Sequence, residues 1–216
     1  FELAPVYHPK KDSVPNQELS LLVSVYGSDS HELFLRAKGI LSELMRYVGM
    51  SEFSLDRKVD EKRWHKGRSA SIVVNKKTVG IIGQISGNVK DSFSIDPGVV
   101  MIELDFQSLL KTMTLTKSYN ELPQFPAVKR DLAFVVQERV EYADLEKALH
   151  KISDLVDAVE LFDVYRGKGV DKGSKSVAVH LSFRSDDKTL EAKQVDDLIE
   201  NMRTVLQKEF GAVLRS

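Results

Sequence analysis

The sequence predicts an α+β protein in which an antiparallel sheet module precedes a second domain of order β-α-β-β-α-β. Three observations carry this prediction. Strand-length apolar runs recur in both halves of the 216-residue chain, and two segments place apolar residues at helical spacing. Residues 112–124 between the halves are polar, contain proline and lack periodicity. We therefore predict a boundary that gives domains 1–117 and 118–216.

Composition indicates an ordinary globular protein. The chain has 42% hydrophobic and 29% charged residues, and no apolar run reaches the length of a membrane helix, so we expect no membrane partner. The absence of cysteine excludes disulfides and thiolate chemistry, and it favours a reducing compartment, the cytoplasm. The chain does not begin with methionine and starts inside a strand-like run, which indicates a piece of a longer protein.

The first domain is expected to be rich in strands. Strands are predicted at residues 1–7, 19–26, 53–59, 71–74, 79–85 and 99–106. A polar connector is expected at residues 9–15, a hairpin turn at 75–77 and a short helix at 107–111. The irregular order of these elements favours a largely antiparallel sheet over a doubly wound parallel fold.

One strong helix is predicted in this domain. Its apolar residues fall on one face: Phe34, Ala37, Ile40, Leu41, Leu44, Met45 and Val48. Any of Ser28, Asp29 and Ser30 can cap its start, and Gly49 suits the position just past its end. We interpret the stripe mainly as packed core and give a smaller share to contact with another subunit.

The second domain is predicted to be ferredoxin-like, with four antiparallel strands and both helices on one side. Strands are expected at residues 131–136, 156–165, 175–184 and 212–215, and one helix at 142–152. The second helix has its apolar face at Val195, Leu198, Ile199, Met202, Val205 and Leu206.

Strand alternation assigns the side chains of this sheet to two faces. The residues expected against the helices are Leu132, Phe134, Val136, Phe162, Val164, Val177, Val179, Leu181 and Phe183. The uncovered face should then present Ala133, Asp163, Tyr165, Ser176, Ala178 and His180. A sheet face with few large aliphatic residues and an exposed aromatic ring is typical of surfaces that stack single-stranded RNA bases.

Side-chain chemistry gives these residues separate roles. Tyr165 offers a ring for stacking, and Asp163 offers two acceptor oxygens that match the N1–H and N2–H donors of guanine. Ser176 can donate or accept a hydrogen bond, and Ala133 leaves room for a base to lie close.

Charge gives no global case for nucleic-acid binding, because the formal net charge is −1 and residues 118–216 carry 15 Lys and Arg against 18 Asp and Glu. An RNA site must therefore rest on local basic groups. The candidate phosphate contacts are Lys129, Arg130, Arg166, Lys168, Lys172 and Lys175. The glycine spacing does not match a P-loop and the five histidines lack ligand spacing, so we predict no metal site and no catalytic residue.

Three motifs in one order and spacing carry a resemblance. They are FPAVKRDLAFVV, LFDVYRGKGVDKGSKSVAVHLSFR and DDKTLEAKQVDDLI, beginning at Phe125, Leu161 and Asp186. Together they resemble the anticodon-binding domain of bacterial-type phenylalanyl-tRNA synthetase beta subunits. In the first domain, FELAPVY, AKGILSELMRYVG, WHKGRSASIVVNKKTVGIIGQI and VVMIELDF are similar to the class II synthetase-like module of the same family.

The resemblance implies that the chain is a C-terminal fragment of a phenylalanine-tRNA ligase subunit. Domain 1–117 would be part of a non-catalytic scaffold that packs against the alpha subunit, and the full assembly would be an alpha2-beta2 heterotetramer using ATP and magnesium. Domain 118–216 would bind tRNA(Phe), with Ala133, Asp163, Tyr165 and Ser176 matching the positions that read the first anticodon base, a guanine. The fragment alone is expected to be inactive and to hold no cofactor.

Ordinary structural roles stay open for each of these residues. Tyr165 can be a rim residue, as can His180, and Asp163 can pair with Arg130 or Arg184. The basic loop can simply be solvated. The alternative function is therefore a ferredoxin-like protein-interaction or ligand-sensing module without RNA binding. A free-standing metabolic enzyme has less support, because the sequence shows no nucleophile, cofactor loop or metal set.

Overall fold

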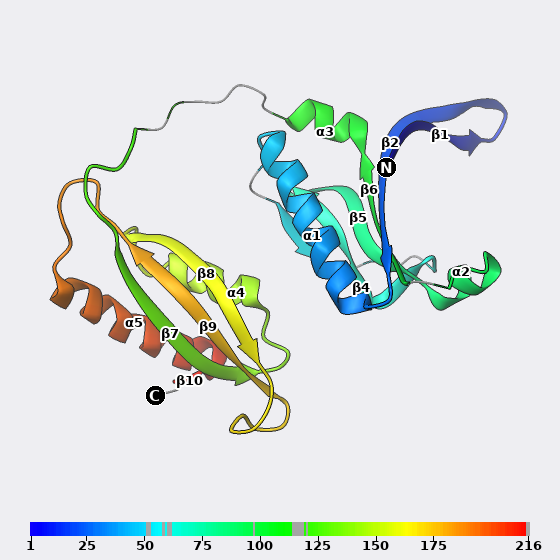
Figure 1. Cartoon of the computed structure of the whole chain (residues 1–216). Helices are drawn as coiled ribbons and strands as arrows, with labels where there is room; N and C mark the ends of the chain where they lie inside the picture. Colours follow the sequence, from blue (N-terminus) through cyan, green and yellow to red (C-terminus); the bar gives the residue numbers. More distant parts are fainter. Residues whose placement is uncertain are drawn as a thin grey trace. The chain divides into compact units, whose positions relative to one another are not determined.

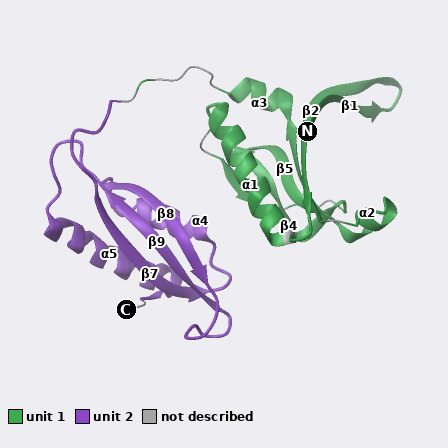
Figure 2. Ribbon diagram, in the orientation of Figure 1, with its two compact units in different colours: residues 1–119 green, residues 120–216 purple. Residues whose placement is uncertain are grey.

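A computed structural model describes residues 1–50, 53–57, 59, 62–96, 98–113, 119 and 121–214. The chain divides into two compact units, Phe1–Tyr119 (unit 1) and Asn120–Ser216 (unit 2), shown in green and purple in Figure 2. The boundary predicted between residues 117 and 118 lies outside the described residues. None of the helices in the described ranges is long and apolar enough to cross a membrane.

Unit 1 is built on a six-stranded sheet of order β1-β2-β6-β5-β4-β3, in which every neighbouring pair is antiparallel. Its elements are β1 (Glu2–Lys10), β2 (Ser13–Gly27), α1 (Ser30–Tyr47), β3 (Ser54–Asp56), β4 (Trp64–Val74), β5 (Lys77–Ile85), α2 (Gly87–Ser92), β6 (Gly98–Asp105) and α3 (Phe106–Thr112) (Figure 1). The predicted antiparallel sheet is confirmed.

The long helix α1 forms where the apolar stripe predicted it. The Asp29 carboxylate accepts hydrogen bonds from the backbone N–H groups of His31 and Glu32, which caps the helix start. Its apolar face packs against the sheet in one core cluster, whose fully buried members include Ala37, Leu41, Met45, Ile72, Ile82, Ile102 and Leu104. The core interpretation is confirmed for six of the seven residues of the stripe, whereas Ile40 is 38% exposed.

The polar connector expected at residues 9–15 was wrong. Strands β1 and β2 instead form a tight hairpin, with Lys10 opposite Ser13. Asp12 turns the chain with a φ of 59°, a left-handed conformation that aspartate tolerates better than most residues. Polar side chains at this position therefore belong to a paired hairpin, and polarity alone could not separate it from a loop.

Unit 2 has the predicted β-α-β-β-α-β order, which confirms the ferredoxin-like fold class. Its elements are β7 (Val128–Gln137), α4 (Tyr142–His150), β8 (Val156–Tyr165), β9 (Ser174–Phe183), α5 (Ala192–Phe210) and β10 (Val213–Leu214). The sheet order is β10-β7-β9-β8, and α4 and α5 cover one face of it (Figure 1). Arg215, predicted in the last strand, lies outside the described residues.

One predicted face assignment in unit 2 was wrong. Phe162 was expected against the helices, but its side chain is 50% exposed and its ring stacks on that of His180 on the other face. The cause is a β-bulge in β8: Leu161 pairs with Val179 and Asp163 with Ala178, which leaves Phe162 as the extra residue. A bulge breaks the alternation on which the prediction rested.

Candidate nucleic-acid interface

The face of the unit 2 sheet opposite α4 and α5, here called the open face, carries three rows of cross-strand neighbours. These rows are Asp131–His180–Glu160, Ala133–Ala178–Asp163 and Val135–Ser176–Tyr165. Neighbouring rows on one face of a sheet lie about 7 Å apart. The strand register therefore brings Ala133 of β7, Asp163 and Tyr165 of β8 and Ser176 of β9 into two adjacent rows. Their predicted face is confirmed.

The Tyr165 ring is held by the turn that follows β8. Its side chain is 38% exposed, and its hydroxyl donates a hydrogen bond to the carbonyl oxygen of Lys168 at 3.3 Å. A Cβ added at Gly167 would lie 2.6 Å from the Tyr165 hydroxyl oxygen and 2.8 Å from Cζ. Only a glycine at position 167 leaves room for the ring in this orientation, so the start of the basic loop determines where the aromatic surface points.

Asp163 presents its carboxylate without competition from the two arginines considered above. Arg130 pairs with Asp196 on α5 at 3.2 Å, and Arg184 pairs with Asp157. Among the described residues, the Asp163 side chain has no hydrogen-bond or ion-pair partner, and it is exposed. Both carboxylate oxygens are therefore available to a ligand on the open face.

Ser176 and Ala133 line the surface between these two side chains. Ser176 is only 5% exposed, because Val135 and Tyr165 flank it in its row. Ala133 is half-buried and adjoins Ala178. A flat ligand can therefore approach the backbone closely here, while contact with the Ser176 hydroxyl requires it to lie directly over the row.

The basic residues divide into those already paired and those that are not. Arg166 pairs with Glu138 at 2.7 Å, and Lys175 donates to the Glu138 carbonyl oxygen at 3.0 Å. The hydrogen bonds from Arg166 hold the pKa of Glu138 below its ordinary value and raise the pKa of Arg166. Arg130 lies on the helix-covered side, opposite Leu181. Within the described chain, the candidates without an ion-pair partner are Lys129, Lys168 and Lys172.

Comparison with known proteins identifies the two units. Residues 123–215 match a family model described as "Ferredoxin-fold anticodon binding domain", and residues 1–106 match "Phenylalanyl tRNA synthetase beta chain CLM domain". The phenylalanine-tRNA ligase beta subunit of Clostridium tetani (strain Massachusetts / E88) is 33% identical over 218 residues, and that of Dehalococcoides mccartyi (strain CBDB1) is 34% identical over 226. Both alignments cover 100% of this chain and 27% of the relative.

The chain belongs to the phenylalanine-tRNA ligase beta subunit family. The family resemblance stated from the sequence motifs is thereby confirmed. The chain spans about a quarter of the length of the curated relatives it matches.

Two features of this beta-subunit family member escaped the sequence reasoning. Phe162 was assigned to the wrong face, because no local sequence pattern predicts the bulge that exposes it. Glu138 was overlooked as the partner of Arg166, a residue 28 positions away. The one signal in the sequence was the group of basic residues after β8, which favours a nearby acidic partner.

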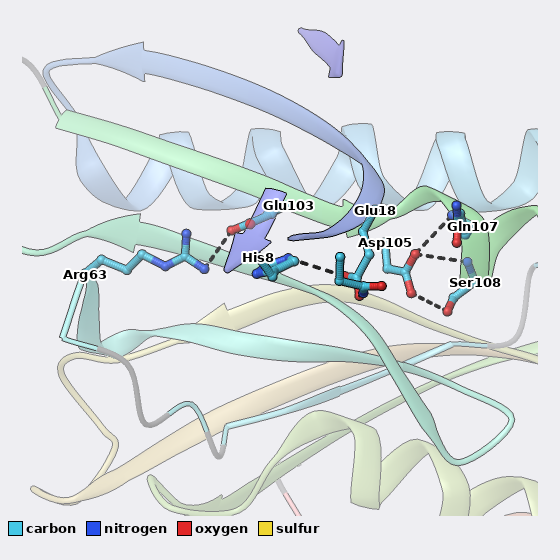
Figure 3. Close-up of polar contacts among 8 residues, drawn as sticks. His8, Glu18, Arg63, Glu103, Asp105, Gln107 and Ser108 are labelled. Carbon is cyan, nitrogen blue, oxygen red and sulfur yellow. Dashed lines mark hydrogen bonds and ion pairs between the residues drawn. The ribbon is translucent and has the colours of Figure 1, made fainter. Parts of the chain in front are cut away.

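Unit 1 of this family member contains a separate hollow on the sheet face opposite α1. Its volume is about 390 Å³, and its walls include Pro5, Leu22, Trp64, Ile85 and Met101. The charged groups along this face pair with one another: Arg63 with Glu103 at 3.0 Å and His8 with Glu18 at 3.4 Å (Figure 3). Among the described residues, the buried indole N–H of Trp64 in this hollow has no hydrogen-bond partner. We nevertheless place the candidate site on the open face of unit 2, because the residues predicted to contact RNA come together there.

Proposed function

We propose that this chain is the tRNA-binding part of a phenylalanine-tRNA ligase beta subunit, and that the open face of unit 2 recognises the anticodon of tRNA(Phe). The observation that carries the proposal is the strand register, which gathers Ala133, Asp163, Ser176 and Tyr165 on the face that the helices leave uncovered. The match of residues 123–215 to an anticodon binding domain supports it.

Each residue has a physical role in this proposal. The first anticodon base, a guanine, stacks on Tyr165 and donates from N1–H and N2–H to the Asp163 carboxylate. Ala133 allows the base to approach the sheet, and the Ser176 hydroxyl bonds its edge. Lys168, Lys172 and Lys129 are the basic side chains offered to the RNA backbone. Because few phosphates are neutralised, we expect RNA affinity to depend only weakly on salt concentration.

Membership of the beta subunit family supports a proposal for the assembly. We propose that unit 1 is a non-catalytic scaffold packing against an alpha subunit in an alpha2-beta2 heterotetramer in the cytoplasm. The complete enzyme would ligate phenylalanine to tRNA(Phe) with ATP and magnesium. The ATP and the metal would bind outside this chain, which would be inactive on its own and would act by positioning the tRNA.

The proposal is tested by the base preference of the Asp163→Asn variant. The wild-type chain should prefer an anticodon stem-loop RNA with guanine at the first anticodon position over one with adenine. The variant should lose about 5- to 150-fold of this preference, since a paired set of hydrogen bonds to a base edge contributes about 1–3 kcal/mol of discrimination. Fluorescence anisotropy with labelled RNA measures the affinity of each protein for the guanine and the adenine RNA.

The matched control is Asp154→Asn, which removes the same charge from an exposed turn before β8. We expect this control to keep the guanine preference. A wild-type chain without any such preference would refute the proposed function and would favour the protein-interaction alternative.

A second prediction concerns Gly167, which positions the Tyr165 ring. Gly167→Ala should displace the ring, because the added Cβ would lie 2.6 Å from the tyrosine hydroxyl oxygen. Tyr165→Ala should lower RNA affinity about 5- to 150-fold, because stacking contributes about 1–3 kcal/mol. Gly167→Ala should lower RNA affinity by a smaller factor, because it displaces the ring without removing it. A double-mutant cycle measured by anisotropy tests this: in a Tyr165→Ala background, Gly167→Ala should have no further effect.

Gly87→Ala is the control for this pair, because a Cβ there meets no atom within 4 Å. Additive effects of Gly167→Ala and Tyr165→Ala would contradict the positioning role of the glycine.

A further inference from the structure

The bulge in β8 creates an aromatic surface beside the proposed guanine site. Phe162 precedes Asp163 in the chain, and its ring lies parallel to that of His180, with the centroids 4.0 Å apart and an angle of 16° between the planes. Phe162 is 50% exposed. Because the hydrophobic gain is roughly proportional to the area buried, half of the possible gain of this ring is unused, and the ring is available for a further contact.

The second ring of this pair is held in place from the neighbouring strand. Nδ1 of His180 donates a hydrogen bond to the Asp131 carboxylate at 2.7 Å, across the β7–β9 pair. On its other side His180 faces Glu160 of β8. The His180 ring is therefore restrained on one side by this hydrogen bond and on one face by the Phe162 ring.

The charge around the pair points to the kind of group that it can receive. Asp131, Glu160 and Asp163 surround it on the open face, and of the basic residues only Lys129, opposite Ser182 in the next row, lies near it among the described residues; Lys168 and Lys172 lie beyond the far end of β8. Acidic side chains repel phosphate but accept hydrogen bonds from the amino groups of bases. Aromatic rings stack on any base. A nucleobase fits this surface better than a phosphate group does.

We propose that Phe162 and His180 form a second base-stacking platform, which holds a nucleotide adjacent to the guanine. This proposal rests on the proposed function, because it places the second base next to the Asp163–Tyr165 site. The platform occupies the row beside that site, about 7 Å along the strands. That separation suits two neighbouring bases splayed apart over a sheet, as single-stranded RNA is in sheet-type binding surfaces.

The test measures binding of the whole 216-residue chain to anticodon stem-loops that carry an abasic site on either side of the first anticodon base. Phe162→Leu should weaken binding of the complete RNA at least about fivefold, because an aliphatic side chain cannot stack. One of the two abasic RNAs lacks the base that the platform would hold. Phe162→Leu should not weaken the binding of that RNA. Phe162→Tyr should keep wild-type affinity, since it retains the ring.

Two readouts separate this inference from the proposed function and from a general loss of structure. The guanine preference should be unchanged in Phe162→Leu, as should its thermal unfolding. Phe93→Leu, which alters an exposed phenylalanine of unit 1, is the matched control and should not change affinity. Wild-type guanine preference with no effect of Phe162→Leu would overturn the platform alone. Absence of RNA binding by the wild-type chain would overturn both proposals.

Discussion

Phe134→Ala should destabilise unit 2 by about 3–5 kcal/mol, the usual cost of truncating a buried phenylalanine. Phe134 lies in the centre of β7, is fully buried and belongs to the core cluster that joins the sheet to α4 and α5. Since small domains are stable by only about 5–15 kcal/mol, this loss removes much of the stability of unit 2. RNA binding should then fail at urea concentrations that leave the wild-type chain bound.

The chain permits each unit to be followed separately. Trp64 is its single tryptophan and is buried in unit 1, so tryptophan fluorescence reports on unit 1 alone, whereas far-UV circular dichroism reports on both units. In urea titrations of Phe134→Ala, the fluorescence transition should stay in place while part of the dichroism transition moves to lower urea.

Phe162→Ala is the matched control, because it truncates a phenylalanine of the same sheet that is not buried in the core. Because Phe162 is half-exposed, its truncation should cost less than about 1 kcal/mol. A fluorescence transition that shifts together with the dichroism in Phe134→Ala would show that the two units unfold as one, against their division into separate cores.

Alternation made most of the open face predictable. β7 and β9 keep a strict period of two, so the buried Leu132, Phe134, Val177 and Val179 fix the opposite face for Ala133 and Ser176. β8 does not keep the period of two, because two register shifts interrupt its alternation. Asp163 and Tyr165 nevertheless lie on the predicted face, since both follow the second shift, whereas Phe162 lies at it. Their roles toward RNA stay predictions.

The pairing of charges was beyond the reach of the sequence. Arg130 and Asp196 are 66 residues apart, and Arg166 and Glu138 are 28 apart, so their contacts depend on tertiary structure. This matters for function, because three of the six candidate phosphate contacts are already engaged: Arg130 and Arg166 in ion pairs, and Lys175 in a hydrogen bond to the Glu138 carbonyl oxygen. A count of basic residues in a loop therefore overstates the positive charge available to a ligand.

Gly80→Ala should strongly destabilise unit 1. An added Cβ would lie 2.2 Å from the carbonyl oxygen of Glu103 and 2.8 Å from Cδ2 of Leu104, its partner on β6. The first of these atoms belongs to the backbone, and it cannot withdraw without breaking hydrogen bonds in the centre of the sheet. We expect a loss of about 1–3 kcal/mol or more, as for other overpacked sites, seen as an earlier urea transition in Trp64 fluorescence.

A glycine-to-alanine substitution in α1 should instead increase the stability of unit 1. Gly39 lies on the exposed side of the helix, and a Cβ there would meet no atom within 4 Å. Gly39→Ala should therefore stabilise unit 1 by about 0.5–1 kcal/mol, because alanine favours the helix interior and glycine does not. Both variants should retain the RNA affinity of the wild type under native conditions, since the proposed site lies in unit 2. A Gly80→Ala chain as stable as Gly39→Ala would mean that β5 and β6 are not packed as closely as their register and distances require.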